Sequence, residues 1–127
     1  MRIYLADLAH TYSVDDRSLP IPLGIGYIKA YALENLGDSV SIELFKHPDR
    51  LMETINREPP DIIGFANYGW NEKLNKSVGA HVRSLAPNAL IVAGGPNIDS
   101  DPNNRGIFLK EHNYIDYLII DGGEQPF

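Results

Sequence analysis

The sequence contains no cysteine among its 127 residues. A chain without thiols forms no disulfide and offers no thiolate to zinc or to an iron–sulfur cluster. Any such cluster must therefore be held elsewhere. The chain also lacks an apolar run near the ~20 residues that a membrane span needs, and its N-terminus does not have the pattern of a signal peptide. These absences predict a cytoplasmic protein.

Several functional motifs are missing as well. The net charge is -6 and Lys and Arg are nowhere clustered, so nothing predicts binding to nucleic acid or to a membrane. Neither Gly-x-Ser-x-Gly nor Gly-x-x-x-x-Gly-Lys occurs, which argues against a serine hydrolase and a P-loop. Gly24-Ile25-Gly26 does not directly follow a strand and is a weak dinucleotide signal. No catalytic residue and no set of metal ligands is predicted.

Along the chain, short apolar runs typical of strands alternate with segments whose apolar residues have helical spacing. Runs typical of strands cover residues 3–6, 40–44, 61–66, 89–93 and 115–120, and helical patterns cover 22–36, 49–57, 71–86 and 101–112. This alternation predicts one α/β domain with a parallel sheet wound by right-handed crossovers. Because residues 40–44 are half polar, they predict an edge strand. The expected fold is therefore a flavodoxin-like (Rossmann-like) three-layer, doubly wound sheet of order 2-1-3-4-5.

This fold implies specific helix contacts. In the first helix the apolar face is predicted to be Leu23, Tyr27, Ala30, Tyr31 and Leu36, which would cover the sheet. Asn71 is the predicted N-cap of the third helix.

The right-handed crossover rule also predicts a shortage of helices. It puts the first helix on one face of the sheet and the next three on the other, so a fifth is needed to cover strands three to five. The sequence stops at Phe127 before any such helix. We therefore expect residues 1–127 to be one domain, the N-terminal fragment of a longer protein. That face would be covered by later residues of the same polypeptide or by a neighbouring chain, as in a dimer.

Residues with small side chains end the central strands. Gly94 and Gly95 follow the apolar strand 89–93, and Ala66 ends the strand before it, so a flat or phosphorylated ligand could approach the main chain there. Ligands of open α/β sheets bind at this carboxyl edge. The candidate cofactor-binding residues are Asp7, Leu8, His10, Ala66, Asn67, Tyr68, Trp70, Gly94, Gly95, Pro96, Asn97, Gly122 and Glu124.

Three of these candidates have ordinary structural explanations too. Tyr68 and Trp70 could stack on a planar cofactor, although aromatic residues at a strand end also cap cores. His10 could be an axial metal ligand, but a lone histidine in a polar loop is more often simply solvated.

Four segments taken together resemble the N-terminal cobalamin (B12)-binding domain of B12-dependent radical S-adenosylmethionine (SAM) enzymes. They are Pro22-Leu23-Gly24-Ile25-Gly26-Tyr27 with Ala30-Tyr31 and Leu36-Gly37; Pro60-Asp61-Ile62-Ile63-Gly64-Phe65 with Tyr68 and Trp70-Asn71; Gly94-Gly95-Pro96; and Asp116-Tyr117 leading to Gly123-Glu124 and Pro126-Phe127. The similarity spans nearly the whole chain. It implies that the dimethylbenzimidazole tail of cobalamin enters beside the central strands, with the corrin ring and its cobalt above the strand ends.

The chain departs from the broader B12-binding family at two of its three motifs. The family's Asp-x-His-x-x-Gly motif supplies a histidine to cobalt, but here His10 follows Asp7 one position late. Ala66-Asn67-Tyr68 stands where Ser-x-Leu is expected, and Gly94-Gly95 is intact. The resemblance also implies a catalytic radical SAM domain beyond Phe127, which would carry the [4Fe-4S] cluster and S-adenosylmethionine. The domain itself would then present a corrinoid, commonly for methyl transfer, and catalyse nothing alone.

Two alternatives remain at this point. One is an interaction module of the receiver or flavodoxin type, although no aspartate ends the third strand and no Ser/Thr-rich loop follows the first. The other is a degenerate scaffold that keeps the fold and binds no cofactor.

Overall fold

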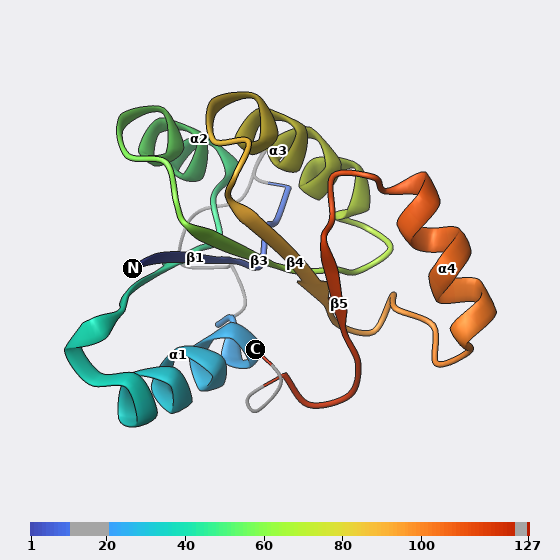
Figure 1. Cartoon of the computed structure of the whole chain (residues 1–127), viewed down its shortest axis with the longest axis horizontal. Coiled ribbons are helices and arrows are strands. Elements are labelled where there is room, and N and C mark those ends of the chain that lie inside the picture. The colour runs from blue at the N-terminus through green and yellow to red at the C-terminus, as the bar shows by residue number, and fades with distance from the viewer. Residues whose placement is uncertain (11–20, 124–126) are drawn as a thin grey trace.

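The computed structural model describes residues 1–10, 21–123 and 127, and it has three layers, with a sheet between two layers of helices (Figure 1). The elements in chain order are β1 (Arg2–Ala6), α1 (Leu23–Leu36), the 3-10 turn η2 (Gly37–Ser39), β2 (Ser41–Phe45), α2 (Pro48–Arg57), β3 (Ile62–Ala66), α3 (Glu72–Leu85), β4 (Leu90–Gly94), α4 (Pro102–Glu111) and β5 (Tyr117–Ile119).

All five strands are parallel, in the order β2-β1-β3-β4-β5, which confirms the predicted flavodoxin-like fold. The register pairs Gly64 of β3 with Val92 of β4, and Gly94 of β4 with Ile119 of β5. Because every strand runs the same way, their carboxyl ends meet at one edge of the sheet. The loops that follow β1, β3, β4 and β5 therefore lie near one another.

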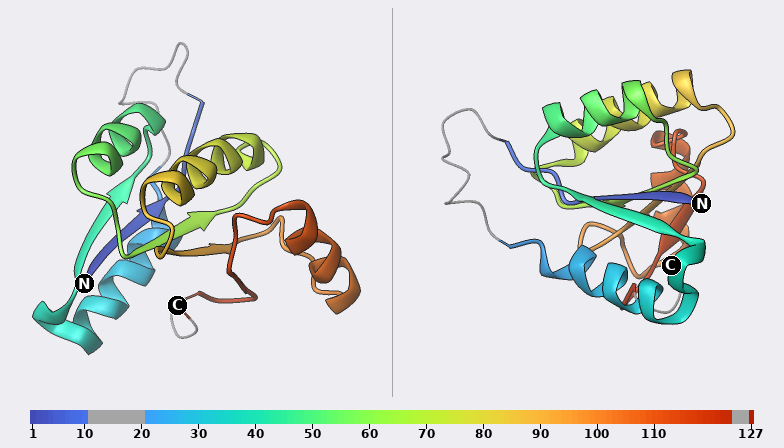
Figure 2. Two further views of the ribbon diagram at one scale, coloured as in Figure 1. Left: turned by 45° about the horizontal axis from the view of Figure 1, so that its top comes forward. Right: turned by 90° about the vertical axis from the view of Figure 1, so that its left-hand side faces the viewer.

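The sheet separates two hydrophobic cores, and Figure 2 shows α1 on one face with α2 and α3 on the other. The larger core lies under α2, α3 and α4 and includes Leu51, Ile63 and Val82, with Phe108 of α4 packed against it. The smaller core lies under α1 and is built on Leu5, Ile25 and Ile42, with Phe127 packed against it. As predicted, the crossovers leave α1 as the helix that covers its face.

The predicted apolar face of α1 is wrong. Ile25 is buried and Ile28 and Ala32 pack on the small core, whereas Leu23 and Tyr27 are each 61% exposed. Tyr31, Leu36 and Ala30 are exposed as well. The helix has apolar residues on nearly every side, so its hydrophobic pattern did not identify the face that contacts the sheet.

Among the described residues, no helix follows β5. On the face of α1, this leaves parts of β4 and β5 uncovered. Leu90 and Tyr117 point to that face by strand alternation, and they are 36% and 61% exposed. None of the helices in the described part of the chain is long and apolar enough to span a membrane.

Candidate functional site

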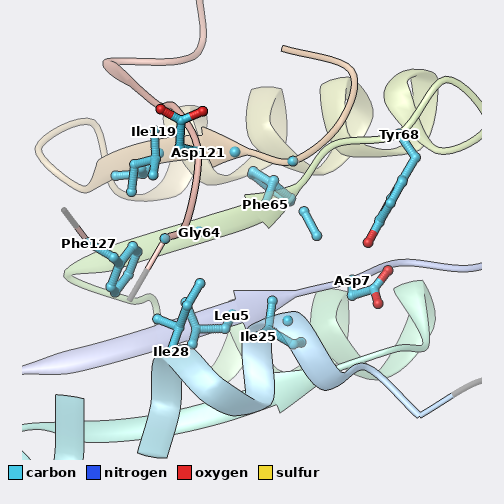
Figure 3. A pocket seen from close by; sticks show the side chains of 16 residues that line it. Leu5, Asp7, Ile25, Ile28, Gly64, Phe65, Tyr68, Ile119, Asp121 and Phe127 are labelled. Atoms are coloured by element: carbon cyan, nitrogen blue, oxygen red, sulfur yellow. The ribbon is translucent and has the colours of Figure 1, made fainter. Parts of the chain in front are cut away.

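A cavity of about 180 Å³ lies between α1 and the carboxyl half of the sheet (Figure 3). We call it the tip slot. Its lining comes from β1 and its loop (Leu5, Asp7), from α1 (Gly24, Ile25, Ile28), from β3 and its loop (Gly64, Phe65, Ala66, Tyr68), from β4 and its loop (Val92, Gly94, Gly95) and from β5 and the residues beyond it (Ile119, Asp121, Gly123, Phe127). The slot lies on the α1 face of the sheet.

The walls of the tip slot suit a flat apolar group. Leu5, Ile25, Ile28, Val92 and Ile119 supply branched aliphatic side chains from both the helix and the sheet. Five of the lining residues are glycines, and of these Gly24 is the one at which the missing side chain borders open space. A cavity with aliphatic walls and few polar groups is typical of sites for small ligands and cofactors.

Three lining glycines lie within regular structure, Gly24 inside α1, Gly64 inside β3 and Gly94 at the end of β4. An added Cβ on Gly24 would meet no atom within 4 Å, so this residue faces open space beside the slot. An added Cβ on Gly64 would lie 2.9 Å from both Leu5 Cδ2 and Phe127 Cε2. A glycine within a helix or strand costs roughly 0.5–1 kcal/mol relative to alanine, so the slot is built at the expense of local stability.

Polar groups gather at the open end of the slot. Lys46 Nζ donates to Asp7 Oδ2 over 3.1 Å, and both side chains are largely buried. Burial raises the pKa of Tyr68, and the nearby Asp7 carboxylate raises it further. The Tyr68 hydroxyl therefore stays protonated and can donate a hydrogen bond at the slot mouth, where Figure 3 shows it beside Asp7.

Tyr68 also forms one half of an aromatic pair. Its ring stacks on that of Trp70 with centroids 4.3 Å apart and an interplanar angle of 11°. Trp70 is 65% exposed, so the pair does not cap a core. His10 Nε2 donates to the main-chain oxygen of Trp70 over 2.9 Å and ties the β1 loop to the β3 loop. The result is a flat aromatic surface next to the slot mouth.

Gly95 is required by the chain's own packing. Its φ is +110°, and an added Cβ would lie 2.9 Å from Asn67 O. Asn67 N donates to Gly94 O over 2.6 Å, and Asn97 N donates to Asn67 O over 3.2 Å. The two glycines thus let the β3 and β4 loops join closely and also line the slot.

Three buried asparagines fix the β1 and β3 loops from the α3 side. Asn71 Nδ2 donates to Leu8 O and Ala66 O, while its Oδ1 accepts from Tyr68 N. Asn75 Nδ2 donates to Asn67 Oδ1 over 3.1 Å. Asn71 precedes α3, as predicted for an N-cap, but its side chain makes no capping bond to that helix. The Asn71 side chain uses its hydrogen bonds to hold the loops after β1 and β3 together and does not cap α3.

The predicted site residues therefore separate into groups. Five of them line the slot: Asp7, Ala66, Tyr68, Gly94 and Gly95. Leu8 and Asn67 are buried in the interior, Asn97 is half-buried and donates to Glu72, and His10, Trp70, Pro96 and Gly122 are exposed outside the lining. Glu124 lies outside the described residues.

The sequence-based prediction missed most of the apolar lining. Leu5, Ile25, Ile28, Val92, Ile119 and Phe127 all line the slot. Their pattern alone resembles that of ordinary core residues. Gly24 and Gly64 could have indicated the slot from sequence, because glycine is disfavoured inside a helix or a strand and often marks a close approach there.

The described residues contain no group of three or more His, Cys, Asp or Glu that could hold a metal ion. They do fit a planar organic ring. The cradle above Gly64 is filled by an aromatic side chain, which shows that a flat ring packs against this bare strand position.

The fold and the slot define a flavodoxin-like α/β domain with a cavity at the carboxyl edge of its sheet. A CheY-like protein, TadZ, from Pseudomonas aeruginosa PAO1 has the same fold, with a TM-score of 0.61 and 12% identity over 97% of this chain and 89% of that one. The model of the B12 binding domain family matches residues 14–127. The chain belongs to this family, as its motifs had indicated.

Two curated relatives are much longer than this chain. The cobalamin-dependent radical SAM methyltransferase TokK of Streptomyces tokunonensis is 30% identical over 112 residues, which is 84% of this chain and 16% of that protein. The 2-(S-pantetheinyl)-carbapenam-3-carboxylate methyltransferase of Streptantibioticus cattleyicolor is 29% identical over the same shares. The chain thus spans about a sixth of the length of these relatives.

Proposed function

We propose that this domain binds cobalamin, with the benzimidazole tail in the tip slot and the corrin ring over the strand ends. The observation that carries the proposal is the slot itself. It opens at the carboxyl edge between aliphatic walls, and Gly24 leaves open space there for a flat ring. Ile25 and Ile28 would contact one side of the tail, and Val92 with Gly94 the other.

The polar groups at the mouth suit the rest of such a ligand. The protonated Tyr68 hydroxyl can donate to a ligand oxygen, and the stacked pair of Tyr68 and Trp70 offers a flat surface to the corrin. His10 Nε2 donates to the Trp70 carbonyl, so in this arrangement that nitrogen is not a cobalt ligand. When bound, the corrinoid would supply the cobalt chemistry, and this chain would position it.

Two glycines of α1 provide a matched test. Gly24 lines the slot and Gly26 does not, yet an added Cβ meets nothing within 4 Å at either position. Each chain is mixed with hydroxocobalamin and desalted, and the visible spectrum of the protein fraction is recorded. The wild type and Gly26→Leu should retain corrinoid absorbance, and Gly24→Leu should lose at least about 90% of it.

The controls separate this proposal from the scaffold alternative. Circular dichroism should show that both leucine variants are folded. Complete loss of corrinoid from the wild-type protein would contradict the proposal and favour a domain that binds no cofactor. Equal retention by Gly24→Leu and Gly26→Leu would place the corrinoid somewhere other than the slot.

We further infer that the domain serves a radical SAM catalytic domain in the same polypeptide. The match covers only 16% of each relative's length, and the names of the relatives describe radical SAM or methyl-transfer activity. That domain would hold the iron–sulfur cluster and S-adenosylmethionine, since this chain has no cysteine. Methyl transfer would be the activity of the whole protein.

The exposed apolar residues beside the slot are the proposed contact for that further chain. Leu23 and Tyr27 of α1, with Leu90 and Tyr117 of the sheet, leave apolar area exposed on one face. Hydrogen exchange should be slower across residues 23–36 in the longer polypeptide than in this domain alone. Equal exchange would contradict the docking. A concentration-dependent dimer that protects the same residues would assign the face to a second copy.

A further inference from the structure

One aromatic side chain, that of Phe127, lines the end of the tip slot that lies away from Asp7 and Tyr68. Figure 3 shows Phe127 beside the middle of β3, at the opposite end of the slot from Asp7 and Tyr68. Phe127 is half-buried, and its main-chain nitrogen donates to Gly123 O over 3.1 Å. Its ring therefore lies where a ligand that enters from the mouth would stop.

The ring of Phe127 packs against β3 at Gly64, where there is no side chain to exclude it. An added Cβ on Gly64 would lie 2.9 Å from Phe127 Cε2, so any other residue there would displace the ring. Phe127 also belongs to the small core with Leu5 and Ile28. A ligand that extended past this point would have to remove the ring from those contacts.

The dimensions of the slot indicate how long a ring system fits between its mouth and Phe127. Gly64 and the end of β3 at Ala66 are two residues apart, which corresponds to about 7 Å at the usual rise of a strand. The cavity of about 180 Å³ is slightly larger than the ~150 Å³ cavity that holds one benzene in an engineered protein. The slot thus suits one or two fused rings, and a third ring would reach Phe127.

We propose that Phe127 is a specificity-determining residue, the end wall that sets how long a ring system the tip slot accepts. This inference rests on the proposed binding of cobalamin through its tail. It goes further by assigning selection among corrinoid tails to one residue. A short base enters without moving Phe127, while a base longer by one ring must displace it and lose the packing around Leu5 and Ile28.

Corrinoids that differ only in their tails test the end wall. Dissociation constants are measured for corrinoids with a benzimidazole, a dimethylbenzimidazole or a naphthimidazole tail, and for tailless cobinamide. The wild type should bind the naphthimidazole form at least about tenfold more weakly than the benzimidazole form. In Phe127→Ala the ratio should fall below about threefold. Intrinsic differences among the corrinoids cancel when the ratio is compared between variants.

Two further variants keep the test decisive. Ile107→Ala removes an exposed apolar side chain from α4, away from the slot, and should keep the wild-type ratio. Phe127→Leu keeps apolar volume in the small core and should give an intermediate ratio. It replaces Phe127→Ala if the alanine variant does not fold by circular dichroism.

The outcomes distinguish the two proposals. If the wild type binds no tailed corrinoid, or binds cobinamide as tightly, then tail binding in the slot is wrong. If tailed corrinoids bind but the wild type does not discriminate by length, only the end wall is overturned. A ratio that stays at the wild-type value in the folded Phe127 variants also overturns the end wall alone.

Discussion

Gly95 lies directly against the main chain of Asn67, where an added Cβ would stand 2.9 Å from the carbonyl oxygen and 3.1 Å from the nitrogen. Both atoms belong to backbone that is itself hydrogen-bonded to the β4 loop, so neither can move aside without breaking those bonds. The contact joins the two central loops of the carboxyl edge. The sequence had suggested that this glycine makes room for a ligand, and the structure shows that it also makes room for the loop after β3.

Replacement of Gly95 by alanine should therefore destabilise the domain. A non-glycine residue at a φ of +110° costs about 1–3 kcal/mol, and the contact with Asn67 adds to this. We expect a loss of at least about 2 kcal/mol in the free energy of unfolding, measured by urea denaturation. Gly106→Ala in α4 is the matched control, because an added Cβ there meets nothing, and it should gain up to about 1 kcal/mol. Equal stability of the two variants would contradict this account.

Glu72 should make stability depend on acidic pH. The hydrogen bond from His112 Nε2, 3.0 Å away, lowers the pKa of Glu72, and Asn97 and Lys76 act in the same direction against desolvation. A carboxyl with a lowered folded pKa stabilises the fold above its unfolded pKa, near 4.5, and this contribution is lost as the pH falls through the folded value. Between about pH 5.5 and about pH 3, wild-type stability should fall more steeply than that of Glu72→Gln.

The control for this pH effect is Glu53→Gln. Glu53 is exposed on α2, so its variant should follow the wild-type pH profile. Urea denaturation at each pH gives the comparison. Parallel profiles for the wild type and Glu72→Gln would show that the contact between His112 and Glu72 does not bear on stability.

Arg83 should be intolerant of even a conservative change. Its guanidinium donates to the main-chain oxygens of Pro87, Ala89 and Tyr114 and to Asp116 Oδ2. A lysine ammonium cannot reproduce this planar, divergent set of donors. Arg83→Lys should lose about 1–3 kcal/mol of stability, because polar groups at the start of β4 and β5 lose their partner. Arg57→Lys, at an exposed position, should change stability by less than about 0.5 kcal/mol.

Trp70 should report on the ligand directly. It is the single tryptophan of the sequence, is 65% exposed and stacks on Tyr68 at the slot mouth. If a corrinoid lies over the strand ends, its visible chromophore should quench tryptophan fluorescence in a saturable way. Trp70→Phe should remove the signal while corrinoid is still retained after desalting. Retention with unchanged fluorescence in the wild type would place the corrin away from this aromatic pair.

Much of the fold could be predicted from the local pattern of the chain. The strand between residues 89 and 93 was recognisable because its apolar run has no polar alternation, as is typical of an interior strand of a parallel sheet. The edge position of β2 followed from its half-polar sequence. The handedness of crossovers then fixed which helices share a face, since it applies to any parallel sheet.

Less of the site could be predicted. The strand ends were located because small residues follow each run, and five of the proposed residues do line the slot. The face of α1 was predicted wrongly because an evenly apolar helix has no preferred side in sequence. Asn71 resembled an ordinary helix cap, yet its side chain bonds to Leu8 and Ala66 instead. The side of α1 that faces the sheet and the hydrogen bonds of Asn71 both depend on residues that are distant along the chain.

By itself the sequence determined the order and type of the elements, the parallel sheet and the edge at which a ligand would enter, because these follow from periodicity and chain chirality. The tertiary structure alone decided that Gly95 packs on Asn67, that Ile25 and Ile28 face the slot and that Phe127 closes it above Gly64. The physical reason is that steric exclusion acts between surfaces brought together by folding. The residue types alone do not show which of these side chains will meet, because the contacts form only when the sheet and its helices come together.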